Sequence, residues 1–102
     1  MARVIAMYKA PTNVAAFDKY YFETHVPIAK RLPGLTKYEI SRGPVSSPAG
    51  ASAVHLVAIL HFDDMAAIQK ALVSAEGQAT VADLQKFATA GVEILMFDQH
   101  EV

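Results

Sequence analysis

The stretch AVHLVAILHF, residues 53–62, predicts a β-strand around which the rest of the fold can be built. It is rich in aliphatic residues, contains no Gly or Pro, and has the length of an ordinary strand. Side chains alternate between the two faces of a strand. One face carries Val54, Leu56, Ala58, Leu60 and Phe62, and the other carries His55, Val57, Ile59 and His61. Because both faces are largely apolar, we expect a central strand that is covered on both sides.

The other elements follow from hydrophobic periodicity and from turn-forming residues on either side of this strand. The first helix is expected to start near Thr12 or Asn13, and Pro27 should end or kink it at Val26. A strand at 35–43 alternates charged and apolar residues, which is typical of a sheet edge. The sequence also predicts strands at 2–8 and 92–99 and a second helix at 64–74.

Three segments are predicted as irregular or interrupted. Residues 43–52, GPVSSPAGAS, combine Gly, Pro and Ser and are expected to form a flexible loop. The stretch AEGQA, residues 75–79, is expected to break the second helical region. Thr80 and Asp83 then resemble a capping box that opens a further helical turn over 80–88.

The element order is therefore β-α-β-β-α-β. Right-handed connections turn this order into a four-stranded antiparallel sheet with the helices on one face, the ferredoxin-like α+β arrangement. The strands at 2–8 and 53–62 lie in its centre. We expect residues 1–102 to form a single domain of this kind, because a chain of this length fits one domain.

The helices of such a fold cover only one face of the sheet, yet three of the predicted strands are apolar on both faces. Hydrophobic residues make up 53% of the chain, above the usual ~45–50%. No segment is left over to cover the second face. We therefore predict a homodimer in which two sheets pack face to face and close into an α+β barrel.

Composition argues against several classes of protein. The net charge is −1 and the basic residues are scattered, whereas nucleic-acid binders usually carry a clustered basic stripe. No stretch is apolar enough to span a membrane, no signal peptide is recognisable, and no cysteine is present. We expect a cytoplasmic protein that binds neither nucleic acid nor membrane.

Several segments of the chain resemble the EthD-like proteins. In the N-terminal half they are Tyr8-Lys9-x-Pro, Phe17-Asp18-x-Tyr20-Tyr21, Thr24-His25-Val26-Pro27-Ile28-Ala29 and Leu32-Pro33-Gly34-Leu35. In the C-terminal half they are Ala75-Glu76-Gly77-Gln78, Ala82-Asp83-Leu84 and Phe87-Ala88. The resemblance implies a dimeric α+β barrel and an association with bacterial breakdown of ethyl tert-butyl ether beside an oxidising system. The wider superfamily includes cofactor-free monooxygenases, cyclases, isomerases, haem enzymes and stress-response proteins, so the fold does not select a reaction.

His25 is the best candidate for chemistry. Tyr21 lies four residues earlier on the same helix face. A histidine in the cleft between helices and sheet can act as a general acid or base near neutral pH, and a tyrosine can stabilise a developing oxyanion. The alternative is structural, because a histidine at a helix C-terminus also bonds the last free carbonyls. We predict His25 and Tyr21 as the catalytic pair.

Three further residues are predicted to contact a small hydrophobic or aromatic ligand: Tyr38, His55 and Phe17. Ordinary core packing is the alternative for Phe17, and a structural role is the alternative for His55. His55 and His61 are about 20 Å apart along an extended strand, too far to share a metal ion. No metal-ligand spacing occurs elsewhere, so we predict neither a metal site nor a cofactor.

These features lead to one leading hypothesis and three alternatives. The leading hypothesis is an auxiliary or catalytic, oxidoreductase-related role in the breakdown of a small hydrophobic compound, with His25 as acid or base. The alternatives are a non-catalytic binding or stress-response protein, a cofactor-free cyclase or isomerase, and a haem protein.

Overall fold

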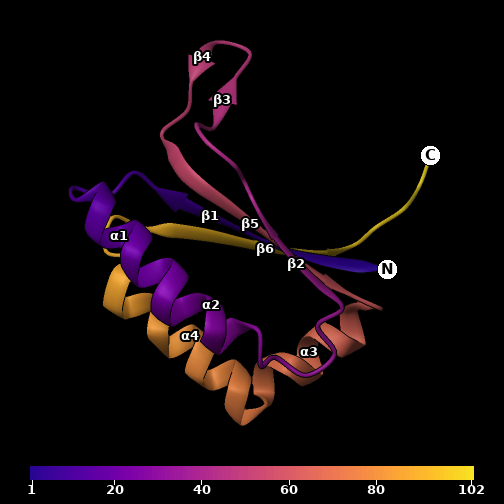
Figure 1. Ribbon diagram of the computed structural model, residues 1–102. Coiled ribbons are helices and arrows are strands. Elements are labelled where there is room, and N and C mark those ends of the chain that lie inside the picture. Colours follow the sequence, from indigo (N-terminus) through magenta and orange to yellow (C-terminus); the bar gives the residue numbers. More distant parts are fainter.

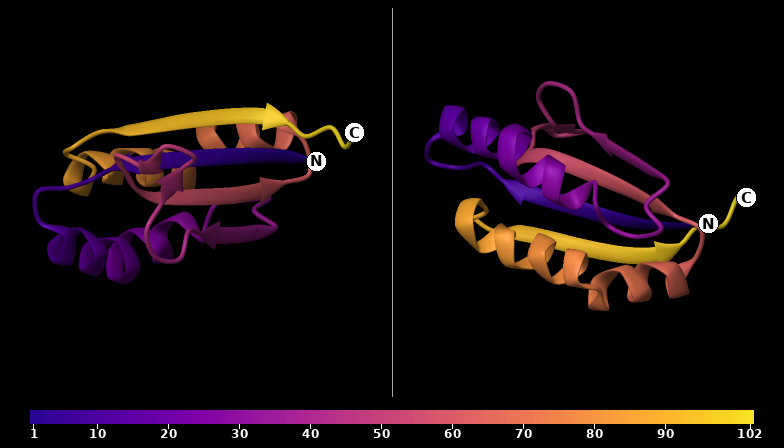
Figure 2. Two further views of the ribbon diagram at one scale, coloured as in Figure 1. Left: turned by 90° about the horizontal axis from the view of Figure 1, so that it is seen from above. Right: turned by 60° about the horizontal axis from the view of Figure 1, so that its bottom comes forward.

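The centre of the sheet is formed by β5 (Val54–Phe62) and β1 (Ala2–Lys9) in the computed structural model, which describes residues 1–102. β2 (Lys37–Ile40) pairs with β5 at one edge, and β6 (Val92–Asp98) pairs with β1 at the other. The order β2-β5-β1-β6 is antiparallel throughout, as Figures 1 and 2 show. The predicted ferredoxin-like α+β fold and its two central strands are confirmed.

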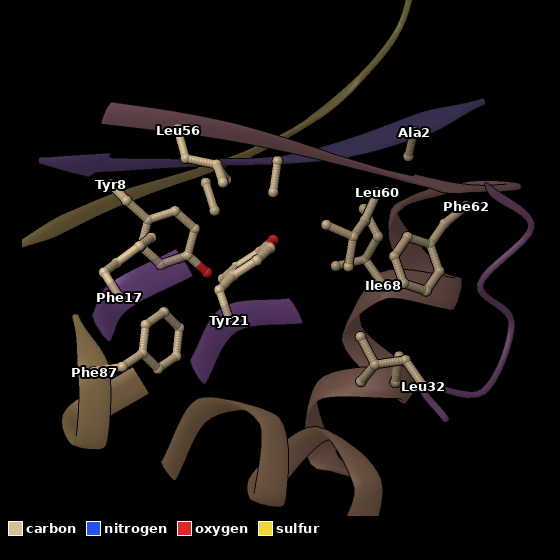
Figure 3. Packing of buried hydrophobic residues seen from close by; sticks show 13 residues of the cluster. Ala2, Tyr8, Phe17, Tyr21, Leu32, Leu56, Leu60, Phe62, Ile68 and Phe87 are labelled. Carbon is tan, nitrogen blue, oxygen red and sulfur yellow. The ribbon is translucent and has the colours of Figure 1, made fainter. Parts of the chain in front are cut away.

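The helices gather on one face of this sheet (Figures 1 and 2). They are α1 (Val14–Tyr20), a π-helix η1 (Tyr21–His25), α2 (Val26–Ala29), α3 (Met65–Val73) and α4 (Ala75–Phe87). Tyr8 and Phe62 of the sheet pack against Phe17, Tyr21 and Ile68 of the helices, as Figure 3 shows. This aromatic and aliphatic layer is the core of the molecule.

The first helical segment begins as predicted but does not end where expected. Asn13 is the N-cap, and its side chain accepts a hydrogen bond from the backbone N–H of Ala16. Pro27 neither stops the segment nor disturbs Val26, whose backbone is helical. Instead the winding widens to a π-helix, in which the Val26 N–H reaches back to the Tyr21 carbonyl. Pro27 lies directly after this wider winding, at the start of α2.

The predicted break at residues 75–79 is wrong. Ser74 caps α4 by accepting from the Gly77 N–H, and the helix runs without interruption from Ala75 to Phe87. Thr80 bonds the Glu76 carbonyl inside this helix, so Thr80 and Asp83 do not form a capping box. α3 and α4 approach closely at Gly77, and a Cβ there would collide with the carbonyl oxygens of Ala71 and Leu72.

The connection between β2 and β5 is more ordered than the predicted loop. It contains two short paired strands, β3 (Ser46–Ser47) and β4 (Gly50–Ala51), in a small hairpin. Figure 1 shows the hairpin extending away from the helix layer, beyond the sheet. The hairpin residues are exposed, and they make no part of the core.

The second face of the sheet is not covered by any segment of the chain (Figure 1). Strand register places Ile5 between Ile59 and Leu95 at the centre of this open face. β6 is partly exposed on both sides. Its side chains are 42–44% exposed at Leu95 and Phe97 on the open face and at Ile94 and Met96 on the helix side. The sheet therefore keeps an apolar surface that the monomer does not bury.

Candidate active site

An apolar cavity of about 210 Å³ lies between the sheet and the helices. Four alanines, Ala6, Ala29, Ala58 and Ala71, line it, and their small side chains leave the space that larger residues would fill. Fifteen of its 17 lining residues are hydrophobic, and the other two are His25 and Thr80. Ile94 and Met96 of the exposed strand β6 also line the cavity, so one wall borders solvent.

His25 is held in this cavity by a carboxylate from the opposite helix. Its Nδ1 lies 2.9 Å from Oδ2 of Asp83 on α4, and the two side chains are only 3% and 4% exposed. The hydroxyl of Tyr20 donates to the other oxygen, Oδ1, of Asp83 at 2.7 Å. The sequence prediction that Asp83 is a helix cap is therefore wrong. The imidazole also packs on the ring of Phe87, with ring centroids 4.6 Å apart.

The tautomer of His25 follows from this contact. An ionised carboxylate only accepts hydrogen bonds, so Nδ1 carries the proton and Nε2 carries the lone pair. Nε2 makes no hydrogen bond within the chain, and no fully buried side-chain nitrogen or oxygen is left without a partner. Nε2 is therefore not fully enclosed, and His25 is one of the residues that line the cavity.

Electrostatics favour the neutral form of this histidine. Burial lowers the pKa of His25 below its ordinary value, and the hydrogen bond and charge of Asp83 oppose that change without overcoming it. Near pH 7 the imidazole is then an unprotonated base, and the neighbouring carboxylate can stabilise it once it takes a proton.

A group of two buried tyrosines and one partly buried tyrosine adjoins the histidine. The hydroxyls of Tyr21 and Tyr38 are 2.6 Å apart, and the Tyr8 ring packs edge-on against Tyr21. Tyr38 and Tyr8 line the cavity, whereas Tyr21 does not line it but contacts three residues that do, namely Tyr8, His25 and Tyr38. Burial raises the pKa of each of the three phenols. They stay protonated at neutral pH and can donate hydrogen bonds but cannot act as bases.

The two remaining predicted residues lie elsewhere. Phe17 is 5% exposed in the core and does not line the cavity. His55 has no partner on β1, because a β-bulge places it opposite the shift between Tyr8 and Lys9. Its Nε2 lies 2.7 Å from Oδ1 of Asp18 on α1, at a separate hollow of about 390 Å³. The structure thus brings His25 and Tyr38 to one cavity and leaves His55 outside it.

Sequence reasoning missed the roles of Asp83 and Tyr20. One signal was present, because Asp83 stands four residues before Phe87 and thus faces inward with it. A carboxylate on the buried stripe of a helix needs a partner. That partner is 58 positions away, and only the folded chain identifies it.

No helix in the structure has the length and apolar character required to cross a membrane. The chain also has no group of three or more His, Cys, Asp or Glu side chains arranged to hold a metal ion.

The fold and the enclosed histidine define a ferredoxin-like α+β protein with a cavity between sheet and helices. The EthD domain matches residues 9–91, and this chain belongs to the EthD family. An uncharacterized 11.0 kDa protein from the thcB-thcC intergenic region of Rhodococcus erythropolis is 32% identical over 102 residues, covering 100% of this chain and 98% of that protein. The crystal structure of an EthD family protein from Bacillus halodurans is 34% identical, with a TM-score of 0.89 over 98% of this chain and 99% of that one.

More distant structures share the fold alone. SnoaB, a cofactor-independent oxygenase from Streptomyces nogalater, has a TM-score of 0.68 at 17% identity, covering 99% of this chain and 94% of that one. A dimeric ferredoxin-like protein of unknown function from Thermobifida fusca also has a TM-score of 0.68, at 14% identity, covering 96% and 90%. The same architecture therefore occurs in an oxygenase and in a dimer of unassigned function.

Proposed function

We propose that the protein is a cofactor-independent acid–base catalyst that acts on a small hydrophobic molecule, in support of oxidative breakdown of such compounds. One observation carries the proposal: His25 lines an apolar cavity while its Nδ1 is anchored to the buried Asp83, which leaves Nε2 as the nitrogen available to a ligand. A base held by an orienting carboxylate beside a binding cavity is the usual arrangement for proton abstraction.

The reaction starts with proton transfer from an activated C–H or O–H bond of the ligand to Nε2 of His25. The electron pair stays on the ligand as an enolate or phenolate. Asp83 stabilises the imidazolium through Nδ1–H, and the Tyr38 hydroxyl donates to the new oxyanion. Return of the proton to another carbon gives isomerisation. Attack of the carbanion on a second carbonyl gives cyclisation, and the alkoxide formed takes the proton back from the imidazolium. Addition of the carbanion to molecular oxygen gives a peroxide that takes this proton, and loss of water from the hydroperoxide leaves one oxygen atom on the ligand as a carbonyl.

Cavity size limits the ligand. An apolar cavity of about 150 Å³ is enough to bind benzene, whereas drug-sized ligands occupy roughly 300–1,000 Å³. The cavity of about 210 Å³ falls between these values. A compact molecule with one or two rings and one polar group fits both this volume and the almost wholly apolar lining.

We propose in addition that two copies pair through the open face of the sheet. The centre of that face is apolar, with Ile5, Ile59 and Leu95 in one row. Charges of both signs flank this centre: Arg3 and Lys37 lie toward one end of the strands, Glu93 lies toward the other, and Glu39 lies beside Ile59 on the edge strand β2. An apolar centre with a charged rim is typical of an interface, and mixed charges let the face complement itself across a two-fold axis. The dimeric neighbour from Thermobifida fusca supports this pairing.

Deuterium exchange tests the catalytic proposal without a known substrate. The probe is 2-tetralone, a bicyclic ketone with acidic protons beside its carbonyl, in D₂O at pD near 7.5. The wild-type protein is expected to accelerate exchange over buffer, and His25→Gln should remove about 100-fold or more of that acceleration. Loss of the probe's CH₂ signals in proton NMR spectra measures the rate.

The matched control is His100→Gln, which removes a histidine from the exposed C-terminal tail and should leave the exchange rate unchanged. Exchange by His25→Gln at the wild-type rate would rule out His25 as the base. Binding of the probe without any accelerated exchange would favour the alternative, a non-catalytic small-molecule-binding protein.

A further inference from the structure

Asp83 is shared between two donors that come from neighbouring positions of the first helical segment. Tyr20 donates to Oδ1 at 2.7 Å and His25 contacts Oδ2 at 2.9 Å, so each carboxylate oxygen has one partner. The Tyr20 ring packs on Phe87, with centroids 5.4 Å apart, and the same Phe87 packs on His25. Tyr20 does not line the cavity but borders a separate hollow of about 260 Å³ near Lys86.

A second hydrogen bond to a carboxylate weakens the attraction between that carboxylate and its first hydrogen-bond partner. A donor on Oδ1 withdraws negative charge from the whole carboxylate, including Oδ2. The reduced charge on Oδ2 stabilises a protonated imidazole less strongly. The hydrogen bond to a neutral imidazole weakens much less. The hydrogen bond with Asp83 in turn raises the pKa of the Tyr20 hydroxyl, so this donor keeps its proton at neutral pH.

We propose that Tyr20 is a positioning residue whose hydroxyl, by sharing the charge of Asp83, limits how tightly that carboxylate holds the protonated form of His25. This inference rests on the proposed function for its catalytic meaning, because a base that is held too tightly as imidazolium does not return its proton. The contact itself is a property of the folded chain and can be tested without any ligand.

Four other ionisable groups near His25 could also affect its pKa. They are Tyr21 on its own segment, Tyr38 from β2, Tyr8 from β1 and Asp83 from α4. Burial keeps the three phenols protonated through the neutral range. Asp83 is therefore the one charged side chain in contact with the imidazole, and Tyr20 is the group that modifies it.

The test is the titration of His25 followed by carbon and proton NMR of the ring Cε1–H group, with the resonance assigned from its loss in His25→Gln. Tyr20→Phe removes the hydroxyl and keeps the ring stacked on Phe87. It is expected to raise the pKa of His25 by roughly half a unit, the size of a partial change in one hydrogen bond to a carboxylate. Asp83→Asn should move the pKa in the opposite direction, because it removes the negative charge.

Phe22→Leu is the matched control, since Phe22 is on the same segment, is 51% exposed and takes no part in the hydrogen bonds of Asp83. It should leave the pKa of His25 where it is. An unchanged or lowered pKa in Tyr20→Phe would overturn the proposal. Because this readout needs no substrate, its failure is separate from failure of the deuterium-exchange experiment, which tests the proposed function.

Discussion

His25 and Asp83 are a buried pair whose energetics depend on pH. The ordinary pKa of a histidine, 6.5, applies to the unfolded chain, and burial lowers the value in the folded chain. Below pH 6.5 the unfolded state therefore binds more protons than the folded state. Linkage then requires that stability falls as the pH falls through this range, and that it is retained above it.

The first prediction follows from this direction of the pH dependence. The free energy of unfolding should decrease between pH 6.5 and pH 5, with a slope from this group of at most about 1.4 kcal/mol per pH unit. Urea unfolding at half-unit intervals measures it. His25→Gln should have a flatter profile in this window, whatever its absolute stability. An equal slope in the two proteins would show that His25 does not account for the dependence.

A second prediction concerns the buried carboxylate. Asp83→Asn replaces an ionised acceptor of two hydrogen bonds by a neutral amide, and should cost about 1.5–3 kcal/mol of stability at pH 7. Urea unfolding gives the value. The matched control is Asp18→Asn, because Asp18 also pairs with a histidine but is 43% exposed. That change should cost less than about 1 kcal/mol. Equal losses would mean that burial does not strengthen the Asp83 contacts.

At the level of elements, the sequence predicted those parts of the fold that depend on local pattern. The two apolar faces of residues 53–62 identified a central strand, and Asn13 identified a helix start. The wide π-turn before Pro27 was not predictable, because tertiary packing of Tyr21 and His25 decides between ending a helix and changing its winding. The continuous α4 was missed because Gly77 is a poor helix former in isolation. In the folded chain α3 approaches closely at this position.

The candidate site could be predicted only in part for the same reason. His25 and Tyr38 were identified as site residues by their chemistry, and both line the cavity. Asp83 could not be paired with His25 from sequence spacing, since the contact joins two different helices. The position of His55 depends on a bulge in β5 that alternation alone does not indicate.

The third prediction tests the helix crossing. In an ordinary exposed helix, Gly→Ala stabilises by about 1 kcal/mol. Gly77→Ala should instead destabilise, by roughly 1–3 kcal/mol, because its Cβ would meet the backbone of Ala71 and Leu72. Thermal and urea unfolding measure the change. Ala79→Gly, at an exposed position of the same helix, should show the ordinary cost of about 1 kcal/mol. A stabilised Gly77→Ala protein would contradict the close contact.

For the whole molecule, the main feature is the open face of the sheet, an apolar surface that a single chain leaves exposed. The fourth prediction is that the wild-type protein sediments as a dimer at micromolar concentration, and that Ile59→Glu shifts it to the monomer. A charge at the centre of a buried interface has no partner and is strongly unfavourable. Val81→Glu, on the exposed side of α4, is the control and should remain dimeric. A wild-type monomer in this experiment would refute pairing through the sheet.

The exposed strand β6 has a consequence for how ligand and partner affect one another. Its alternate residues line the cavity at Ile94 and Met96 and the open face at Leu95 and Phe97. Adjacent side chains share one backbone, so a displacement that widens the cavity also moves the face on which a second copy would rest. For the proposed ligand and the proposed dimer, we therefore expect the two equilibria to be coupled. The coupling would be reciprocal: the factor by which the ligand changes self-association equals the factor by which self-association changes the affinity for the ligand.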